Sequence, residues 1–142
     1  MTRAMRSSLL CVLALVPVIA HADCLPPETP ALSCTLSNGG QLALCWTPQQ
    51  ARLAYDKAPG GPAEVVVPLG DVTGLTSSDW ASSTLISVGG SYEVYLSGQI
   101  AGLNLIWDGG GSTSYTCATG SVNGSLAELN EAAIYAPSSK ED

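Results

Sequence analysis

The sequence predicts an all-β fold, a small antiparallel β-barrel or sandwich of about eight strands with one short C-terminal helix. Apolar and polar side chains alternate in short runs at roughly ten-residue spacing, and Gly, Pro and Asn separate the runs. No long helical pattern lies between them, which argues against a parallel α/β fold. We therefore assign residues 1–22 to a signal peptide, 23–30 to an arm, 31–122 to the β-domain, and 123–142 to a short helix and tail.

The first 22 residues have the form of a secretory signal peptide. Arg3 and Arg6 precede an apolar run of 11 residues, Leu9–Ile19, and Ala20-His21-Ala22 has the small-x-small form that signal peptidase cleaves. The run is too short to span a bilayer, which needs about 20 apolar residues. We expect a mature chain that begins at Asp23, is periplasmic or secreted, and has no membrane insertion after cleavage.

The arm and the first hairpin follow the signal peptide. Three prolines between residues 26 and 30 predict an extended arm, which Cys24 would tether. In residues 31–46 two alternating runs flank Asn38-Gly39-Gly40, a strong hairpin signal. A two-residue turn would pair Leu36 with Gln41, whereas a three-residue loop gathers the apolar side chains on one face and is favoured. The favoured pairs are Leu36 with Leu42, Cys34 with Leu44, and Leu32 with Trp46.

Six further strands and one helix complete the prediction. The strands are 51–55, 63–67, 82–88, 91–97, 101–107 and 112–117, and residues 69–80 are predicted as a surface loop. The helix is 126–135, with Ser125 and Glu128 as a capping box and with Leu126, Leu129, Ala133 and Ile134 toward the domain.

Four cysteines in an exported chain of this size predict two structural disulfides. In the favoured register Cys34 points inward and Cys45 outward, so these two cannot reach the roughly 5.5 Å Cα separation that a disulfide needs. Of the three possible connectivities, this parity favours Cys34–Cys117 together with Cys24–Cys45. The two-residue turn would weaken that preference.

Charge and composition restrict the function. After signal cleavage the chain would hold 12 acidic residues and only three basic ones, Arg52, Lys57 and Lys140. Its formal charge would be −9, and no histidine would remain. An acidic surface disfavours nucleic acid and anionic membranes and favours a cationic partner. Without histidine, the usual general base and the commonest metal ligand are missing. We therefore expect no enzyme activity, no cofactor and no metal site.

Two acid–indole pairs stand at predicted turns. Asp79-Trp80 and Trp107-Asp108 suggest a rim for a glycan or a protein, although Asp is also common at turns for structural reasons. A glycan or small-molecule site would place Trp80, Trp107 and Tyr95 around one barrel mouth. The run Gly109-Gly110-Gly111 lacks a phosphate-binding pattern and is predicted as a hairpin turn.

Several short motifs resemble those of a known family. They are Leu32-Ser33-Cys34, the run from Ile86 to Tyr92 (ISVGGSY), Trp107-Asp108-Gly109-Gly110 and Tyr115-Thr116-Cys117. Together they resemble the membrane-bound and periplasmic inhibitors of C-type lysozyme, which are disulfide-tied antiparallel β-barrels.

The resemblance implies a protein partner. In that family a serine from the middle motif and a lysine from the following turn enter the lysozyme cleft, which gives Ser87 the first role, with Ser91 second. No lysine follows Trp107 here, and the pair Cys24 and Cys45 is additional. The leading hypothesis is a disulfide-stabilised protein-binding module, with a C-type lysozyme as a cationic partner, and the alternative is a glycan or small-molecule binding module of the cell envelope. The candidate partner-binding residues are Ser87, Ser91, Tyr92, Trp107, Asp108 and Gly109.

Overall fold

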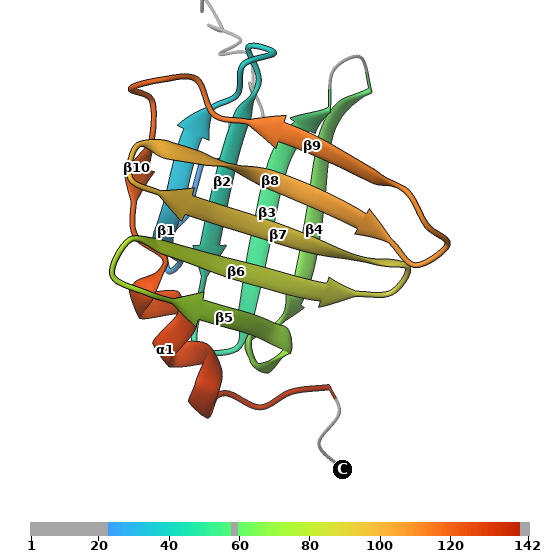
Figure 1. Ribbon diagram of the computed structural model, residues 1–142. Helices are drawn as coiled ribbons and strands as arrows, with labels where there is room; N and C mark the ends of the chain where they lie inside the picture. Colours follow the sequence, from blue (N-terminus) through green and yellow to red (C-terminus); the bar gives the residue numbers. More distant parts are fainter. Residues whose placement is uncertain (1–22, 58–59, 140–142) are drawn as a thin grey trace, which may run out of the picture.

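The protein folds into two five-stranded antiparallel sheets that pack face to face, in a computed structural model that describes residues 23–57 and 60–139. Figure 1 shows the two sheets lying one in front of the other with their strands running crosswise. The predicted all-β class is therefore confirmed, as a sandwich with one short helix. The predicted signal peptide lies outside the described residues.

The second sheet is built from five consecutive strands, whereas the first combines the first four strands with the last one. The first has the order β10-β1-β2-β3-β4 and the second the order β5-β6-β7-β8-β9. In the first sheet the bounds are β10 Asn123–Gly124, β1 Thr29–Thr35, β2 Gln41–Trp46, β3 Gln50–Lys57 and β4 Gly61–Pro68. In the second they are β5 Val72–Thr76, β6 Trp80–Ser87, β7 Gly90–Ser97, β8 Ile100–Trp107 and β9 Ser112–Thr116.

The core fills the space between the sheets. Because successive side chains of a strand point to opposite faces, alternate residues of both sheets meet there. Leucines dominate this layer, and its fully buried members include Leu42, Leu44, Leu53, Leu85, Val94 and Leu103. Burying these aliphatic side chains supplies most of the stabilisation of the fold, at about 25 cal/mol for each Å² of apolar surface removed from water.

The two sheets are joined where β1 and β9 end. Leu36 forms an isolated antiparallel bridge with Cys117, and the Ser37 N–H donates to the Thr116 carbonyl at 2.8 Å. Cys34 and Cys117 form a disulfide at the same place. This contact links residues 83 positions apart, so it ties the beginning of the sandwich to its last long strand.

The first hairpin has a different register from the predicted one. Thr35 pairs with Gln41, Cys34 with Leu42, and Leu32 with Leu44, so five residues form the connection instead of three. The Asn38 side chain shapes this longer turn by accepting the Gly40 N–H at 2.8 Å. The offset from the prediction is two residues along the partner strand. Because an offset of two preserves the face of every side chain, Cys34 still points inward and Cys45 outward.

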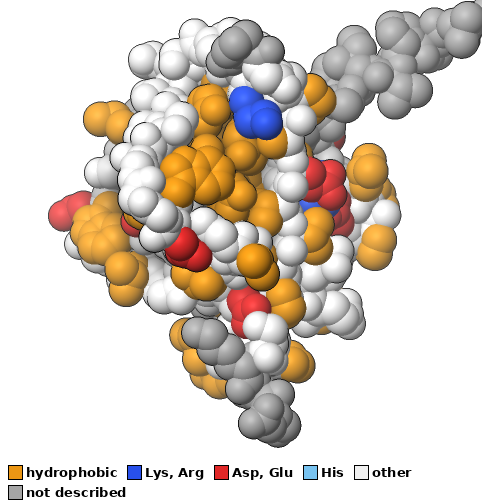
Figure 2. Space-filling model, turned by 90° about the vertical axis from the view of Figure 1, so that its right-hand side faces the viewer, with side chains coloured by type: hydrophobic (Ala, Val, Ile, Leu, Met, Phe, Trp, Pro, Cys, Tyr) orange, Lys and Arg blue, Asp and Glu red, His pale blue; other side chains and the backbone are white. Residues whose placement is uncertain are grey.

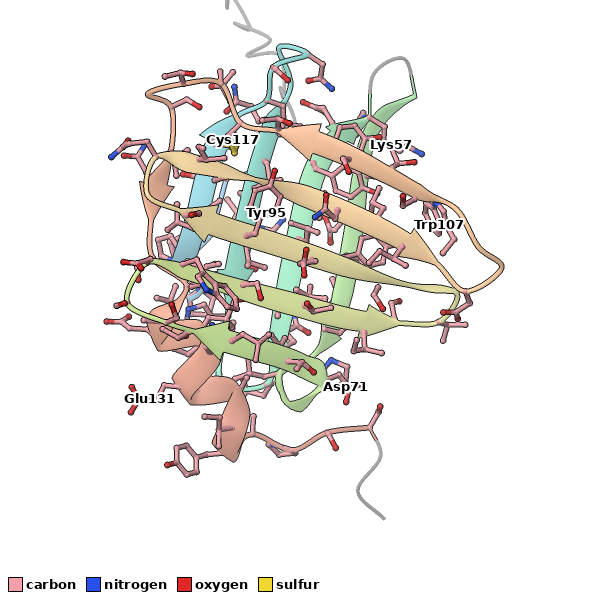
Figure 3. All side chains as sticks on the ribbon, viewed as in Figure 1. Lys57, Asp71, Tyr95, Trp107, Cys117 and Glu131 are labelled. Atoms are coloured by element: carbon pink, nitrogen blue, oxygen red, sulfur yellow. A yellow bond between two sulfur atoms is a disulfide. The ribbon has the colours of Figure 1, made fainter. Side chains whose placement is uncertain are left out.

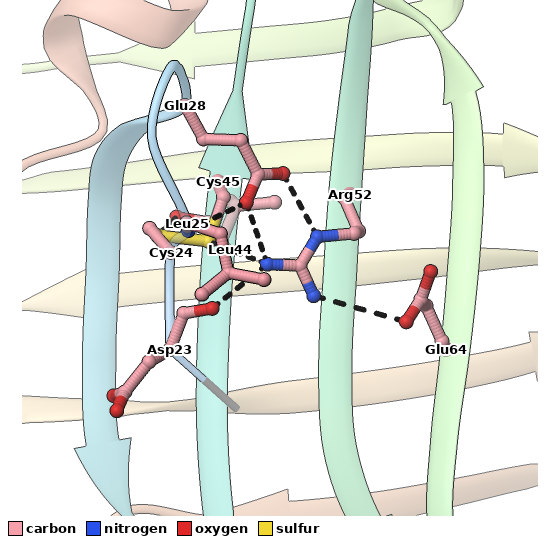
Figure 4. The surroundings of a disulfide bond; sticks show 8 residues. All are labelled: Asp23, Cys24, Leu25, Glu28, Leu44, Cys45, Arg52 and Glu64. Atoms are coloured by element: carbon pink, nitrogen blue, oxygen red, sulfur yellow. Dashed lines mark hydrogen bonds and ion pairs between the residues drawn. A yellow bond between two sulfur atoms is a disulfide. The ribbon is translucent and has the colours of Figure 1, made fainter. Parts of the chain in front are cut away.

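The N-terminal arm is stapled to the outer face of the first sheet. Cys24 and Cys45 form a disulfide there, and Figure 4 shows the Arg52 side chain reaching the same segment. Arg52 donates from Nε and Nη2 to both carboxylate oxygens of Glu28, at 2.8 and 2.7 Å. These hydrogen bonds hold the pKa of Glu28 below its usual value. The arm is not extended throughout, because Glu28 N–H donates to the Leu25 carbonyl in a turn.

The prediction of a surface loop at residues 69–80 is wrong. These residues contain a short 3-10 helix, η1 (Leu69–Asp71), and then β5, which pairs with β6. The Gly and Thr content of β5 hid the strand, since Val72 is its one buried residue. Gly74 is needed there because a Cβ atom would come within 2.3 Å of the Asn130 side chain on the helix.

The helix α1 (Ala127–Tyr135) packs on β5 and η1, as Figure 1 shows at the lower left. Leu126, Leu129 and Ala133 are buried as predicted, but Ile134 is exposed and Asn130 takes the remaining buried position. The predicted capping box does not form. The helix begins at Ala127, one residue later, and although the Ser125 hydroxyl accepts the Ala127 N–H at 3.3 Å, the Ser125 N–H donates to the Ala31 carbonyl at 2.8 Å and not to Glu128. Within the described residues, no helix is long and apolar enough to cross a membrane.

Candidate functional site

Two turns at one end of the second sheet bring the predicted partner-binding residues together. Gly90, which begins β7, pairs with Ser87 on one side and with Trp107 on the other. The Asp108 N–H donates to the Gly89 carbonyl at 3.0 Å and so joins the β6–β7 turn to the β8–β9 turn. We call this end, formed by residues 86–91 and 106–111, the turn surface.

Trp107 is held at this surface by two neighbours. Its indole ring meets Tyr92 in an edge-on arrangement with 6.3 Å between ring centroids, and it lies over Gly90. A Cβ atom on Gly90 would come within 2.7 Å of the Ile106 carbonyl and 3.3 Å of the ring. The residue is 42% exposed, so its ring is supported from below and still accessible. Figure 3 shows Trp107 at this end of the sheet.

Tyr92 has a different position from the other predicted residues. It packs against the core between the sheets, whereas Ser91 points to the outer face between Ile86 and Ile106 of the neighbouring strands. Tyr92 therefore supports Trp107 from inside, and Ser87, Ser91, Asp108 and Gly109 provide the polar groups at the surface.

Exposed apolar side chains gather around these polar groups. Ile86, Val88, Ile106 and Trp107 are all among the large hydrophobic residues that remain exposed. Val88 is fully exposed at the tip of its turn. Figure 2 looks onto this side of the molecule and shows hydrophobic side chains gathered across its middle. Ile86 and Ile106 flank Ser91 on the outer face, whereas Trp107 lies on the face of Tyr92, so exposed apolar side chains are present on both faces of this end of the sheet. Exposed apolar residues that cluster in this way mark interaction sites more often than scattered single residues do.

A groove of about 450 Å³ continues the turn surface toward the first sheet. Ser87 and Val88 line one side, and Val66 and Pro68 of β4 line the other. Asp71 closes it, held by the Ser139 N–H at 3.0 Å and the Ser139 hydroxyl at 2.5 Å. The contribution of β4 could not be foreseen, because nothing in the sequence signals that residues 66–68 approach residues 87–88.

The predicted mouth with Trp80, Trp107 and Tyr95 does not exist. Trp80 pairs with Ser97 at one end of the second sheet, and Trp107 lies at the other end, beside Gly90. Tyr95 lies on the outer face across Gly102, where a Cβ atom would come within 2.5 Å of its hydroxyl. Trp80 and Tyr95 share the outer face, because Ser82 pairs with Tyr95, whereas the length of the strands places Trp107 at the other end of the sheet.

One titratable side chain with a raised pKa, Tyr55, lies between the two sheets. The pKa of Tyr55 is raised to about 12. Burial is the main cause, and the neighbouring Tyr92 and Tyr115 add smaller contributions. Tyr55 and Tyr115 face each other between the sheets with ring centroids 5.6 Å apart. Among the residues that the structure describes, no three His, Cys, Asp or Glu side chains are grouped as a metal site would require.

The two disulfides indicate a domain that folds in an oxidising compartment, as exported proteins do. Comparison with protein-family models, with curated proteins and with solved structures finds no match to this chain.

Proposed function

We propose that this chain is an exported, non-enzymatic protein-binding module and that the turn surface is its binding site. One observation carries the proposal: five residues expected to contact a partner lie at one end of a sheet, together with exposed Ile86, Val88 and Ile106. The five are Ser87, Ser91, Trp107, Asp108 and Gly109.

The composition of the turn surface suits a protein partner. Protein interfaces combine a central apolar or aromatic anchor with a polar rim, and tryptophan is enriched among the residues that dominate binding energy. Trp107 would be that anchor. Its packing on Gly90 and Tyr92 fixes the ring before binding, so little side-chain entropy is lost when a partner covers it.

Charge favours a cationic partner. The sequence carries a formal net charge of −7 over its full length, and Asp108 stands exposed in the turn surface. Arg52 is occupied on the outer face of the other sheet, where it bridges Glu28. An acidic protein attracts a basic one over distances of about 10 Å at moderate salt, which accelerates association and makes it salt-dependent.

A C-type lysozyme is the partner that we propose to test first. Such enzymes are cationic, and the resemblance described above gives Ser87 the role of entering their cleft. Ser87 ends β6 beside the open groove, so a partner loop could reach it. The turn after Trp107 offers Asp108 and glycines instead of a lysine, so binding would depend more on Trp107 and the apolar residues around it.

An inhibition assay with hen-type lysozyme tests this proposal. We expect inhibition at micromolar concentrations that weakens as salt rises, and a loss of about tenfold or more in Trp107→Ala. Trp80→Ala, a change at the opposite end of the sheet, serves as the matched control and should leave inhibition unchanged. Absence of inhibition by the unmodified protein at micromolar concentration and low salt would remove lysozyme as the partner.

A further inference from the structure

A second groove lies at the opposite end of the second sheet from the turn surface. It is about 670 Å³ in volume and is formed by the β5–β6 turn, the β7–β8 turn and the beginning of α1. We call it the Trp80 groove. Its volume falls within the range of small-molecule sites, about 300–1,000 Å³. Nothing in the function proposed above uses it.

Five of the residues that line the Trp80 groove carry a hydroxyl group, and three of these hydroxyls act as hydrogen-bond acceptors. Thr76 Oγ1 accepts from the Asn130 side chain at 3.1 Å, Ser77 Oγ accepts from Asp79 N–H at 3.3 Å, and Ser125 Oγ accepts from Ala127 N–H at 3.3 Å. A hydroxyl that accepts a hydrogen bond in this way can still donate its own. The hydroxyl-bearing lining residues are Thr76, Ser77, Ser78, Ser97 and Ser125.

Asp79 adds an acceptor of a different kind. Its carboxylate lines the groove and is exposed, and among the described residues it has neither a hydrogen-bond partner nor an ion pair. An ionised carboxylate can accept two hydroxyl protons at once. Among the described residues the lining contains no Lys or Arg, so an anionic ligand would meet only the repulsion of Asp79 there.

Trp80 supplies an aromatic surface beside these polar groups. The residue opens β6 opposite the small Ser97 and is 44% exposed. The face of an indole ring carries partial negative charge and a large apolar area. It therefore suits a ligand with an apolar face whose C–H bonds carry partial positive charge.

We propose that the Trp80 groove binds a neutral oligosaccharide. A pyranose ring has an apolar C–H face that matches Trp80 and hydroxyls that both donate and accept, which match Asp79 and the serine hydroxyls. Being uncharged, it meets no repulsion from the carboxylate. Trp107 has no part in this site because it lies at the other end of the sheet.

Nuclear magnetic resonance on the isotope-labelled protein tests this inference. Cellotetraose, maltotetraose and chitotetraose are each added at about 10 mM, a concentration that detects dissociation constants in the millimolar range. We expect at least one of them to shift the Trp80 indole N–H signal and the Ser97 amide signal. Trp80→Ala should weaken that binding about tenfold or more, and Asp79→Asn, which keeps the shape and removes the charge, should weaken it as well. Trp107→Ala should leave it unchanged.

Three outcomes would overturn the inference. They are no shift with any of the three saccharides, binding that survives Trp80→Ala, and stronger shifts of the same signals with a hexalysine peptide than with any saccharide. If Trp80→Ala does not fold, Trp80→Phe keeps a smaller ring and should retain weakened binding. These results leave the lysozyme assay unaffected, because that assay reports on the turn surface.

Discussion

At the scale of single residues, Tyr55 combines deep burial with an ionisable group. It is 5% exposed and faces Tyr115, so forming its phenolate inside the core costs desolvation free energy. Its pKa of about 12 lies above the ordinary value of 10.0. The folded state therefore prefers neutral Tyr55, and the associated stability is complete below pH 10 and is lost as the pH rises from about 10 to about 12.

The Tyr55→Phe variant checks this linkage. Over the interval from pH 10 to 12, the unmodified protein should lose about 2 kcal/mol more unfolding free energy than the variant, because phenylalanine cannot ionise. Denaturant unfolding at several pH values measures the difference. Tyr135→Phe, at the exposed end of α1, is the control and should follow the unmodified protein. Parallel curves for Tyr55→Phe and the unmodified protein would contradict the assignment.

Gly90 shows why the turn surface depends on one small residue. It lies where the Ile106 carbonyl and the Trp107 ring both approach the backbone of β7. We expect Gly90→Ala to lower the unfolding free energy by about 1–3 kcal/mol and to displace the indole ring, because the added methyl would contact backbone that cannot yield easily.

Gly109→Ala is the matched comparison for Gly90→Ala. No atom of the part of the chain that the structure describes lies within 4 Å of a Cβ atom placed on Gly109, and the residue sits in the neighbouring turn. The unfolding free energy of the Gly109→Ala variant should stay within about 0.5 kcal/mol of that of the unmodified protein. Thermal unfolding and tryptophan fluorescence measure the two effects, and equal destabilisation by both substitutions would refute this role for Gly90.

At the scale of elements, α1 is held by a polar contact as well as by its apolar face. Asn130 accepts the Ser83 hydroxyl at 2.6 Å and donates to the Ser82 carbonyl and Thr76 Oγ1, both at 3.1 Å. The Ser83 and Asn130 side chains are buried, so removing one leaves the other groups without partners.

Asn130→Ala should therefore cost about 2–3 kcal/mol of unfolding free energy and raise hydrogen exchange in β5, which α1 covers. The control is Glu131→Ala on the exposed side of the same helix, where Figure 3 shows the side chain pointing into solvent. A similar small effect for both variants would mean that the apolar contacts of Leu126 and Leu129 dock the helix alone.

The first hairpin illustrates how far sequence pattern reaches at this scale. The period of two determines which face each side chain takes, and that part of the prediction agrees with the structure. It does not determine the offset between strands, which the five-residue turn and its Asn38 contact set. The same limit explains β5, where Gly74 and two threonines mask the alternation because α1, and not the opposite sheet, covers that strand.

In the candidate site, too, the sequence pattern indicates local positions but not the contacts made by packing between the sheets. Ser87 and Trp107 are far apart in the sequence, and antiparallel pairing of both with Gly90 makes them neighbours. Tyr92 is partly buried beneath Trp107, since its strand position turns it toward the core. Val66 and Asp71 could not be predicted, because they reach the groove only through the packing of one sheet on the other.

At the scale of the whole molecule, the two disulfides constrain the unfolded chain to different degrees. Cys34–Cys117 closes 83 residues and Cys24–Cys45 closes 21. Chain entropy predicts a stabilisation of about 4–5 kcal/mol for the first and about 3 kcal/mol for the second. Unfolding of the paired alanine variants Cys34→Ala/Cys117→Ala and Cys24→Ala/Cys45→Ala should show this order. A larger loss from the second pair would instead point to the arm as the main determinant of stability.

The whole molecule presents two different ends of one sheet, held by the core and both disulfides. The turn surface combines Trp107 with exposed aliphatic side chains, whereas the Trp80 groove is lined by hydroxyls. This separation lets each site be altered without changing the other, which is why each serves as the control for the other.

The most direct test of the central claim is to map where a cationic protein binds. Isotope-labelled protein is titrated with hen-type lysozyme at low salt, and amide chemical shifts are followed along the chain. The account predicts the largest changes in residues 86–91 and 106–111, which salt would reduce, and no comparable change at Trp80. Changes confined to the outer face of the first sheet around Arg52 and Glu64, or none at all, would contradict it.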